Sequence, residues 1–181
     1  MISQPESPAA EMAATIKLLL LDVDGVLTDG RITYNSEQQE LKSFHIHDGL
    51  GIKLLQRSGI QVGIITGRNS PMVERRANEL GITILVQGRE DKIVAMKDIQ
   101  KQLGLNSHEV AYMGDDLPDL AAIRQAGLGI APANAAAVVR QHADWVTSNP
   151  GGNGAVREAC EFILTAQGLL DSIHQGYAGL T

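Results

Sequence analysis

The sequence contains a single cysteine, no apolar run long enough to cross a membrane, and no surplus of basic residues. With Cys160 alone, no disulfide can form within the chain, and nothing indicates an oxidising compartment. The apolar run over 18–21 stops at Asp22, well short of the ~18 residues that a membrane helix needs. The formal net charge of −6 argues against a broad nucleic-acid surface. We therefore expect a cytoplasmic protein that binds neither membranes nor nucleic acid.

The chain of 181 residues is long enough for one domain with a sizeable core. Prolines and small residues predict a loosely ordered N-terminal segment over 1–15. The domain itself is expected over 16–167, with Cys160 on the buried face of its last helix. The C-terminal tail, 168–181, has too few apolar residues for us to expect it to fold alone.

Short apolar runs alternate with segments of helical periodicity. Strands are predicted at 16–21, 61–65, 82–85, 110–113 and 128–131. Helices are predicted at 50–57, 71–80, 92–103, 117–125 and 156–167, and several are closed by glycine. This alternation predicts an α/β fold with a doubly wound parallel sheet and helices on both faces. A β-hairpin insertion is predicted over 31–45, directly after the first strand.

Three of the predicted strands are followed by polar residues. Asp22 and Asp24 follow the first strand, Thr66 follows the second, and Asp115 follows the fourth. Since ligands bind at the carboxyl ends of the strands in open parallel sheets, we expect these side chains to meet. Two carboxylates ~4 Å apart repel by about 4 kcal/mol at an effective dielectric of about 20. Mg²⁺ would relieve this repulsion, because it is a hard cation that prefers oxygen ligands.

The predicted metal ligands are the carboxylates of Asp22 and Asp115 and the backbone carbonyl of Asp24. Asp116 and Asp119 come next along the chain. We expect these two residues to stand behind the ligands rather than on the metal.

The spacing of Asp22 and Asp24 predicts two chemical roles. Asp22 can attack phosphorus in line and form an acyl phosphate. Asp24 can protonate the leaving oxygen and then deprotonate the water that cleaves the phosphoenzyme. Thr66 and the backbone near Gly67 are expected to hold the phosphoryl oxygens, and Lys92 to balance the remaining charge.

Other functions use parts of this pattern. A lone DxDG also occurs in calcium loops and in turns. A phosphoacceptor signalling domain also uses aspartates, a threonine and a lysine, but its acceptor aspartate lies downstream of its acidic pair. Here the pair Asp115–Asp116 comes last. A third interpretation is a non-catalytic protein that has only kept the fold, and the intact set of four polar positions argues against it.

The ordered set Asp22-x-Asp24, Thr66, Lys92 and Gly114-Asp115-Asp116-x-x-Asp119 resembles the four motifs of the haloacid dehalogenase superfamily. The resemblance extends from about Ile16 to Gln167 and implies that superfamily's Rossmann-like fold. The second aspartate implies its phosphatase branch. Between Asp22 and Thr66 there is room for the hairpin and one helix only, so no cap domain is expected.

Longer stretches resemble one capless group, the 3-deoxy-D-manno-octulosonate 8-phosphate phosphatases of lipopolysaccharide synthesis. These stretches are DVDGVLTDG at 22–30, FHIHDGLG at 44–51, IITGR at 64–68, GGNGAVRE at 151–158 and AQG at 166–168. The resemblance implies a small acidic sugar phosphate as substrate. It also implies a homotetramer with hairpins associated at its centre and each C-terminal tail covering a neighbour's site. Asn153 departs from the group, where we expect a basic residue.

The substrate contacts follow from this resemblance and from the charge of a sugar acid. The resemblance implies pocket contacts from His45, Ile46, His47, Asp48 and Gly49. Contacts are also expected from Asp24, Gly67 and Lys92. The sugar carboxylate needs further cations, and the candidates are Lys53, Arg68 and Arg76.

Three alternatives stay open at this stage. Arg76 taken alone is equally consistent with an exposed helix arginine. His45 and His47 alternate along the chain and could suggest zinc, but no cysteine or third histidine lies nearby, so substrate contact is preferred. A related nine-carbon sugar acid phosphate is an alternative substrate, because the phosphate-end motifs do not distinguish the two sugars.

Overall fold

The computed structural model describes residues 7–180 and centres on a parallel sheet of six strands in the order β5-β4-β1-β6-β7-β8. The strands are β1 (Leu18–Leu21), β4 (Gln61–Ile65), β5 (Ile84–Val86), β6 (Val110–Met113), β7 (Leu128–Ala131) and β8 (Trp145–Val146). The chain runs from β1 to β4 and β5 on one side, then returns to β6 on the other. The order therefore reverses beside β1, and β1 is hydrogen-bonded on both edges.

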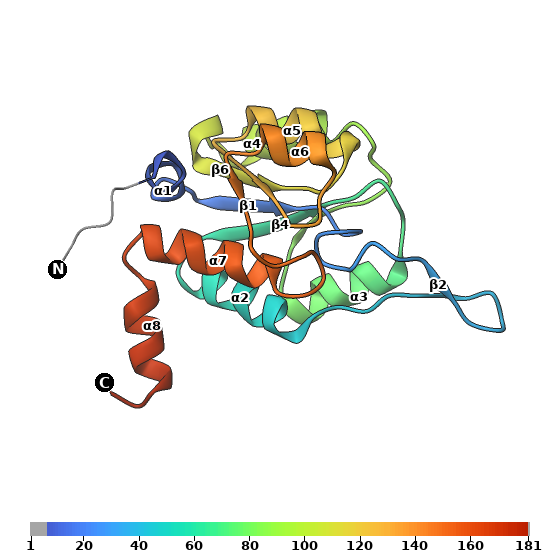
Figure 1. Ribbon diagram of the computed structural model, residues 1–181, viewed down its shortest axis with the longest axis horizontal. Helices are drawn as coiled ribbons and strands as arrows, with labels where there is room; N and C mark the ends of the chain where they lie inside the picture. The colour runs from blue at the N-terminus through green and yellow to red at the C-terminus, as the bar shows by residue number, and fades with distance from the viewer. Residues whose placement is uncertain (1–6, 181) are drawn as a thin grey trace.

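Helices cover both faces of the sheet, as predicted (Figure 1). One layer contains α4 (Lys92–Leu103), α5 (Leu120–Gln125) and α6 (Ala137–His142). The other contains α2 (Ile46–Arg57), α3 (Pro71–Leu80) and α7 (Ala155–Ala166). Short 3₁₀ turns, η1 (Ser107–Glu109) and η2 (Leu117–Asp119), precede β6 and α5. The fold class is confirmed: a doubly wound α/β sheet, with no separate cap within residues 7–180.

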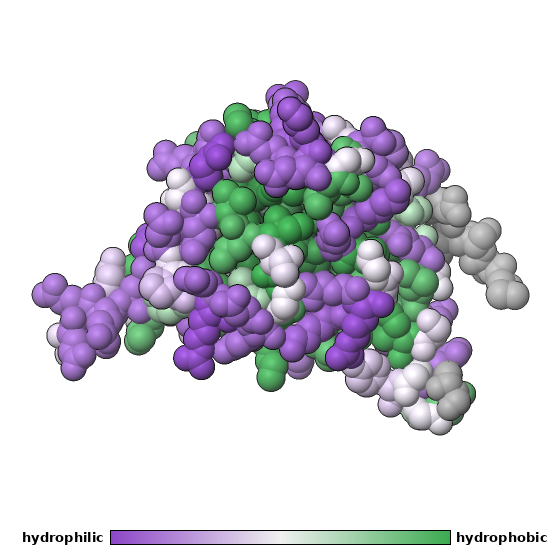
Figure 2. All heavy atoms as spheres, turned by 180° about the vertical axis from the view of Figure 1, so that it is seen from behind, coloured by the Kyte–Doolittle hydropathy of each residue, from purple (hydrophilic) through white to green (hydrophobic). Residues whose placement is uncertain are grey.

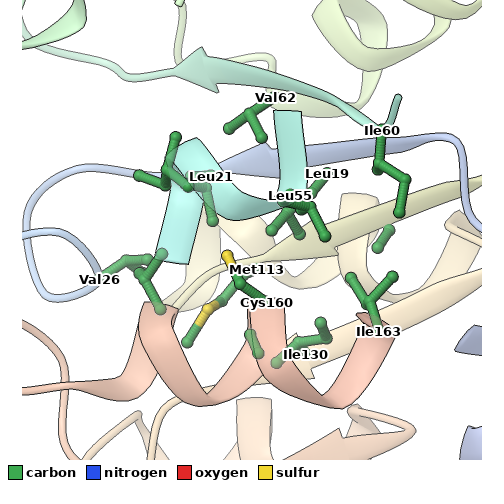
Figure 3. Packing of buried hydrophobic residues seen from close by; sticks show 14 of the residues in the cluster. Leu19, Leu21, Val26, Leu55, Ile60, Val62, Met113, Ile130, Cys160 and Ile163 are labelled. Carbon is green, nitrogen blue, oxygen red and sulfur yellow. The ribbon is translucent and has the colours of Figure 1, made fainter. Parts of the chain in front are cut away.

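The buried strand β1 shows why the sheet sits between two helix layers. Its four leucines are fully buried and alternate between the two hydrophobic clusters. Leu19 and Leu21 face the layer of α2 and α7, where Cys160 is also buried (Figure 3). Leu18 and Leu20 face α4 and α5. A strand that is apolar at every position is stable only when both faces of its sheet are covered.

The predicted hairpin is present within 31–45, and each of its strands has two residues. β2 (Thr33–Tyr34) and β3 (Glu40–Leu41) pair antiparallel, and the ribbon projects from the carboxyl end of the sheet (Figure 1). Seen from behind, hydrophobic residues form a band across the middle of the molecule (Figure 2). Hydrophilic residues cover the helix layers on either side of that band and much of the hairpin.

The expectation of a loosely ordered N-terminal segment is wrong from residue 8 onwards, and residues 1–6 lie outside the described residues. Pro8–Ala13 form a helix, α1, capped by the Ser7 side chain, with Ala9 and Ala13 buried. The amide of Gln167 donates to the carbonyls of Ala13 and Ile16. These contacts anchor the segment at the end of α7.

The tail also forms a helix, α8 (Leu170–Tyr177), contrary to expectation. Leu169, Leu170 and Ile173 pack against the core of their own chain, so three apolar residues suffice to dock it. The helix α6 and the strand β8 were not predicted either. Within residues 7–180, no helix combines the length and the apolar character that a membrane crossing requires.

Candidate active site

The loop after β1 is held tightly against two other loops. Gly25 has a φ of +90°, and a Cβ there would lie 2.0 Å from Oδ2 of Asp115. A Cβ at Gly151 would lie 1.7 Å from the carbonyl oxygen of Gly25, and the Gly152 amide donates to Val26. Glycine is therefore required at Gly25 both for its backbone conformation and for the approach of the carboxylate.

Asp22, Asp115 and Asp119 bring their carboxylates together at this loop, as the order of strands predicted. One oxygen from each lies within 4.8 Å of the others. Burial, followed by the charge of Asp119, raises the pKa of Asp22 to about 7 and that of Asp115 to about 6. We call these three residues together with Lys92 the aspartate cluster.

Lys92, at the start of α4, is the cation of the aspartate cluster. Its Nζ lies 2.9 Å from Asp22 Oδ1 and 2.7 Å from Asp119 Oδ1. Burial alone would lower the pKa of Lys92, but these two carboxylates raise it, so it stays charged. One lysine cannot neutralise three carboxylates, and the remaining negative charge suits a divalent cation.

Asp119 is saturated by donors from the protein. Its Oδ1 accepts from Lys92 and from the hydroxyl of buried Tyr112 at 2.8 Å. Its Oδ2 accepts from the backbone amides of Asp115 and Asp116 at 3.1 and 3.3 Å. Asp22 and Asp115 accept fewer such donors, although Asp22 pairs with Lys92, and they stay the predicted carboxylate ligands of a hard divalent cation. The carbonyl of Asp24 stays a predicted third ligand.

A cleft of about 620 Å³ opens over the aspartate cluster. Nine of the predicted site residues line it: Asp22, Asp24, Thr66, Gly67, Arg68, Lys92, Asp115, Asp116 and Asp119. Thr66 is buried and its hydroxyl oxygen accepts from the Arg68 amide at 3.4 Å. The cleft therefore combines a buried acidic floor with a hydroxyl and a guanidinium on its wall.

The remaining predicted substrate residues lie apart from this cleft. His45 and His47 line a separate hollow with Asn153 and Arg157. Asp48 is buried, and its carboxylate accepts from the amides of Arg157 and Gly154, at 2.8 and 3.4 Å.

Arg76 and three further predicted contacts are also not in the cleft. Arg76 lies over the ring of Phe44 and donates to the carbonyl of His45 at 3.4 Å. Ile46 and Lys53 are exposed on α2, and Gly49 packs against Arg76 and Leu80. Within one chain, the structure does not bring these residues to the aspartate cluster, and their substrate contacts stay predictions.

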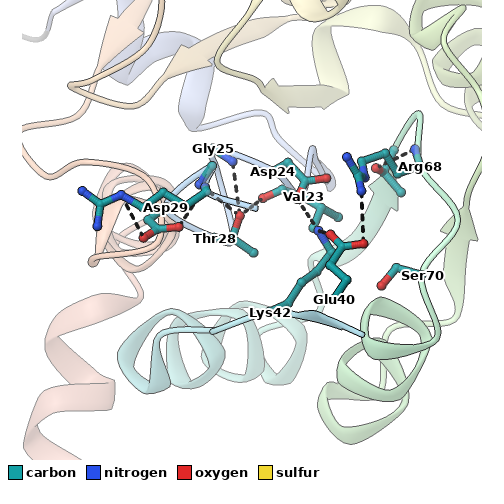
Figure 4. Close-up of polar contacts among 12 residues, drawn as sticks. Val23, Asp24, Gly25, Thr28, Asp29, Glu40, Lys42, Arg68 and Ser70 are labelled. Atoms are coloured by element: carbon teal, nitrogen blue, oxygen red, sulfur yellow. Dashed lines mark hydrogen bonds and ion pairs between the residues drawn. The ribbon is translucent and has the colours of Figure 1, made fainter. Parts of the chain in front are cut away.

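Two charged residues of the hairpin were not predicted as site residues. Lys42 pairs with Oδ1 of Asp24 and, at 3.1 Å, with Oε1 of Glu40. Oε2 of Glu40 lies 3.1 Å from Nη2 of Arg68 (Figure 4). We call this series the hairpin ion-pair chain. Its one sequence signal is that Glu40 and Lys42, two apart on a strand, share a face.

Opposite charges stabilise the hairpin ion-pair chain of Asp24, Lys42, Glu40 and Arg68. Burial alone would raise the pKa of Glu40, but Lys42 and Arg68 hold it below its usual range. Glu40 in turn raises the pKa of Arg68.

Tyr112, on β6, is a further residue that was not predicted as part of the site. Its position in a buried apolar strand suggests packing only, yet its hydroxyl donates a hydrogen bond to Asp119.

Comparison with known proteins gives one consistent group. The profile of the haloacid dehalogenase-like hydrolases matches residues 84–158. The 3-deoxy-D-manno-octulosonate 8-phosphate phosphatase of Escherichia coli K12 is 47% identical over 159 residues, covering 88% of this chain and 85% of that protein. The same enzyme of Salmonella typhimurium is 46% identical over 92% of this chain and 89% of its own.

A solved structure agrees with these matches. The Moraxella catarrhalis 3-deoxy-D-manno-octulosonate 8-phosphate phosphatase, in complex with a magnesium ion, a phosphate ion and KDO, superposes with a TM-score of 0.93. Its sequence is 48% identical, and the match covers 96% of this chain and 99% of that one.

Proposed function

The chain belongs to the 3-deoxy-D-manno-octulosonate 8-phosphate phosphatase family of haloacid dehalogenase-like hydrolases, and we propose that it hydrolyses that sugar phosphate to the free sugar acid and phosphate. The observation that carries this is the convergence of Asp22, Asp24, Lys92 and Asp115 in one cleft of a chain this similar to the family. The proposed setting is lipopolysaccharide synthesis in the cytoplasm. A free thiol such as that of Cys160 is consistent with this reducing compartment.

Asp22 is the proposed nucleophile. Its carboxylate oxygen forms a bond to phosphorus while the bond from phosphorus to the sugar oxygen breaks, giving a phosphoaspartate. Asp24 gives its proton to the departing sugar oxygen. Asp24 then takes a proton from water as that water attacks phosphorus, and the acyl phosphate bond breaks to return the Asp22 carboxylate and release phosphate.

The remaining residues of the cleft bind and balance charge. Lys92, held between Asp22 and Asp119, offers its ammonium to the phosphoryl group. Thr66 and the amide of Gly67, which line the same cleft, are proposed to hold phosphoryl oxygens. Arg68 lines the same cleft and is the proposed partner of the sugar carboxylate. The cofactor is Mg²⁺, which neutralises the carboxylates and the phosphate when bound to Asp22, Asp115 and the carbonyl of Asp24.

We propose a homotetramer whose sites are completed across subunits. The hairpin exposes an apolar row, with Ile32, Tyr34 and Leu41 each at least 50% exposed. Such a row on a short ribbon is an expected site of association. Association would also allow a neighbour to bring the residues around His45 or the end of its tail to the open cleft.

A panel of sugar phosphates compared by kcat/KM, with and without chelator, tests the activity. We expect the eight-carbon sugar acid phosphate to be preferred over the nine-carbon one, and all activity to vanish in chelator and return with Mg²⁺. Preference for the nine-carbon substrate would reassign the enzyme. Full activity of metal-stripped protein would refute the metal's role.

Light scattering and a chain ending at Gln167 test the assembly. We expect a tetrameric mass for the full chain and a lower kcat/KM for the shortened one. A monomer whose kcat/KM is unchanged by removal of 168–181 would mean that the cleft works open and alone.

A further inference from the structure

The hairpin ion-pair chain contains a buried cation for which the proposed mechanism has no use. The side chain of Lys42 is 2% exposed, although it projects from a surface ribbon. Its ammonium contacts only two groups among the described residues, Asp24 Oδ1 and Glu40 Oε1. A lysine is rarely buried to this extent without charged partners. The burial of Lys42 therefore depends on Asp24 and Glu40, and the ammonium in turn restricts the positions of these two carboxylates.

Lys42 is not placed to touch the substrate. It is absent from the residues that line the cleft over the aspartate cluster, whereas Asp24 is among them. Lys42 instead lines a separate hollow with Phe44, Met72 and Arg75. Asp24 is thus the one residue of the cleft that its ammonium contacts among the described residues.

The contact selects one oxygen of Asp24. Lys42 pairs with Oδ1, and this is the one side-chain hydrogen bond that the described residues make to the Asp24 carboxylate (Figure 4). Oδ2 remains to exchange a proton with the leaving oxygen. A general acid must hold its proton within hydrogen-bond reach of the leaving group, so a carboxylate free to rotate would transfer it less often.

We propose that Lys42 is a positioning residue for Asp24: it holds Oδ1 so that Oδ2 faces the leaving oxygen, while Glu40 keeps Lys42 and Arg68 in place. The proposal rests on the role of Asp24 given above. It assigns the hairpin a part in catalysis that is separate from association between subunits.

The experiment compares Lys42→Met with Arg31→Met, which removes an exposed cation from the same insertion. Each variant is assayed with phenyl phosphate and p-nitrophenyl phosphate, which are similar in shape but differ in how much their leaving oxygen needs a proton. The readout is kcat/KM, which covers the steps up to departure of the leaving group. For Lys42→Met we expect a loss of about tenfold to a hundredfold with phenyl phosphate and about threefold or less with p-nitrophenyl phosphate. Arg31→Met should change neither.

Equal losses on the two substrates would overturn the proposal, because a loosened hairpin or a lost substrate contact would act on both alike. Lys42→Arg, which keeps the charge, should recover most of the phenyl phosphate activity. If Lys42→Met does not fold, Lys42→Gln is measured in the same two assays with the same expectation.

A double-mutant cycle with Asp24→Asn separates this proposal from the proposed function. In the Asp24→Asn background, Lys42→Met should change kcat/KM for phenyl phosphate by less than about twofold, because the residue that it positions is gone. An undiminished loss would overturn the positioning role. If Asp24→Asn itself leaves the dependence on leaving group unchanged, the role of Asp24 fails instead.

Discussion

The aspartate cluster and the hairpin ion-pair chain both pair carboxylates with cations, but the elements that carry them differ. The three carboxylates of the aspartate cluster follow β1 and β6, two neighbouring strands at the centre of the sheet, and Lys92 begins α4. The hairpin ion-pair chain depends on a two-stranded ribbon that projects from the body (Figure 1). The comparison teaches that the sheet places the groups proposed to make and break bonds, whereas the ribbon is proposed to orient one group, Asp24, that the sheet has already placed.

The largest effect that tests this division is expected at Asp22. Asp22→Asn should lower kcat by a factor on the order of 10⁴ or more, because Asp22 is the proposed nucleophile and an amide cannot form the phosphoenzyme. The metal-free variant should melt no lower than the wild type, since burial already disfavours the charged carboxylate of Asp22. Steady-state assays and thermal melting check both parts. Appreciable turnover in a contamination-free preparation would contradict the assignment of Asp22, at the end of β1, as the nucleophile.

Tyr112→Phe tests the rigidity of the aspartate cluster without touching the cleft. The hydroxyl of Tyr112 is a donor to Asp119, and burial followed by the charge of Asp119 raises its pKa, so it keeps its proton. Its loss should reduce the free energy of unfolding by about 1–3 kcal/mol, because a buried carboxylate loses a donor. Urea denaturation measures this. Exposed Tyr34→Phe is the control, expected within about 0.5 kcal/mol of wild type.

Glu40→Gln tests the outer end of the hairpin ion-pair chain. Arg68 would lose its charged partner and be less fixed on the wall of the cleft. We expect KM for the sugar acid phosphate to rise about threefold to tenfold, the pattern of weakened substrate binding, and kcat to fall less than in Lys42→Met, because Lys42 loses one of its two carboxylate partners and keeps Asp24. Glu37→Gln, on the tip of the same hairpin, should change neither. A fall in kcat with unchanged KM would contradict the assignment of Arg68 to the substrate carboxylate.

The smallest effect is expected from an ion pair that belongs to neither region. Lys17 Nζ lies 2.5 Å from Glu109 Oε1, and this contact, with the Asn106 amide, lowers the pKa of Glu109 from 4.5 to about 2. A lowered acid pKa stabilises the folded state above 4.5, and this contribution is lost as the pH falls towards 2.

Lys17→Met should therefore cause a small loss of stability near neutral pH that shrinks as the pH falls below 4.5. Denaturant melts at several pH values measure it, and kcat/KM should not change. A loss of activity here would mean that the two regions are not the only charged groups that matter to the reaction.

Much of this molecule could be predicted because its signals are local. Three predicted strands, 61–65, 110–113 and 128–131, have the observed bounds, since each is a short apolar run ended by a turn. The 71–80 and 92–103 helices also match, and both end at a glycine with positive φ. Parallel strands deliver their carboxyl ends to one edge, so the order of Asp22, Thr66 and Asp115 was enough to assemble most of the cleft.

The sequence by itself determined which residues could carry the chemistry, since strand ends and helix starts are local properties of the chain. Only the tertiary structure decided how α1 and α8 dock, which donors saturate Asp119, and that Lys42 reaches Asp24. Each of these depends on a few contacts between segments that are far apart in the chain. Such contacts leave no periodic pattern in the sequence from which they could be predicted. The hairpin shows the limit most clearly, because the path of a two-stranded ribbon is set by where it folds back onto the body.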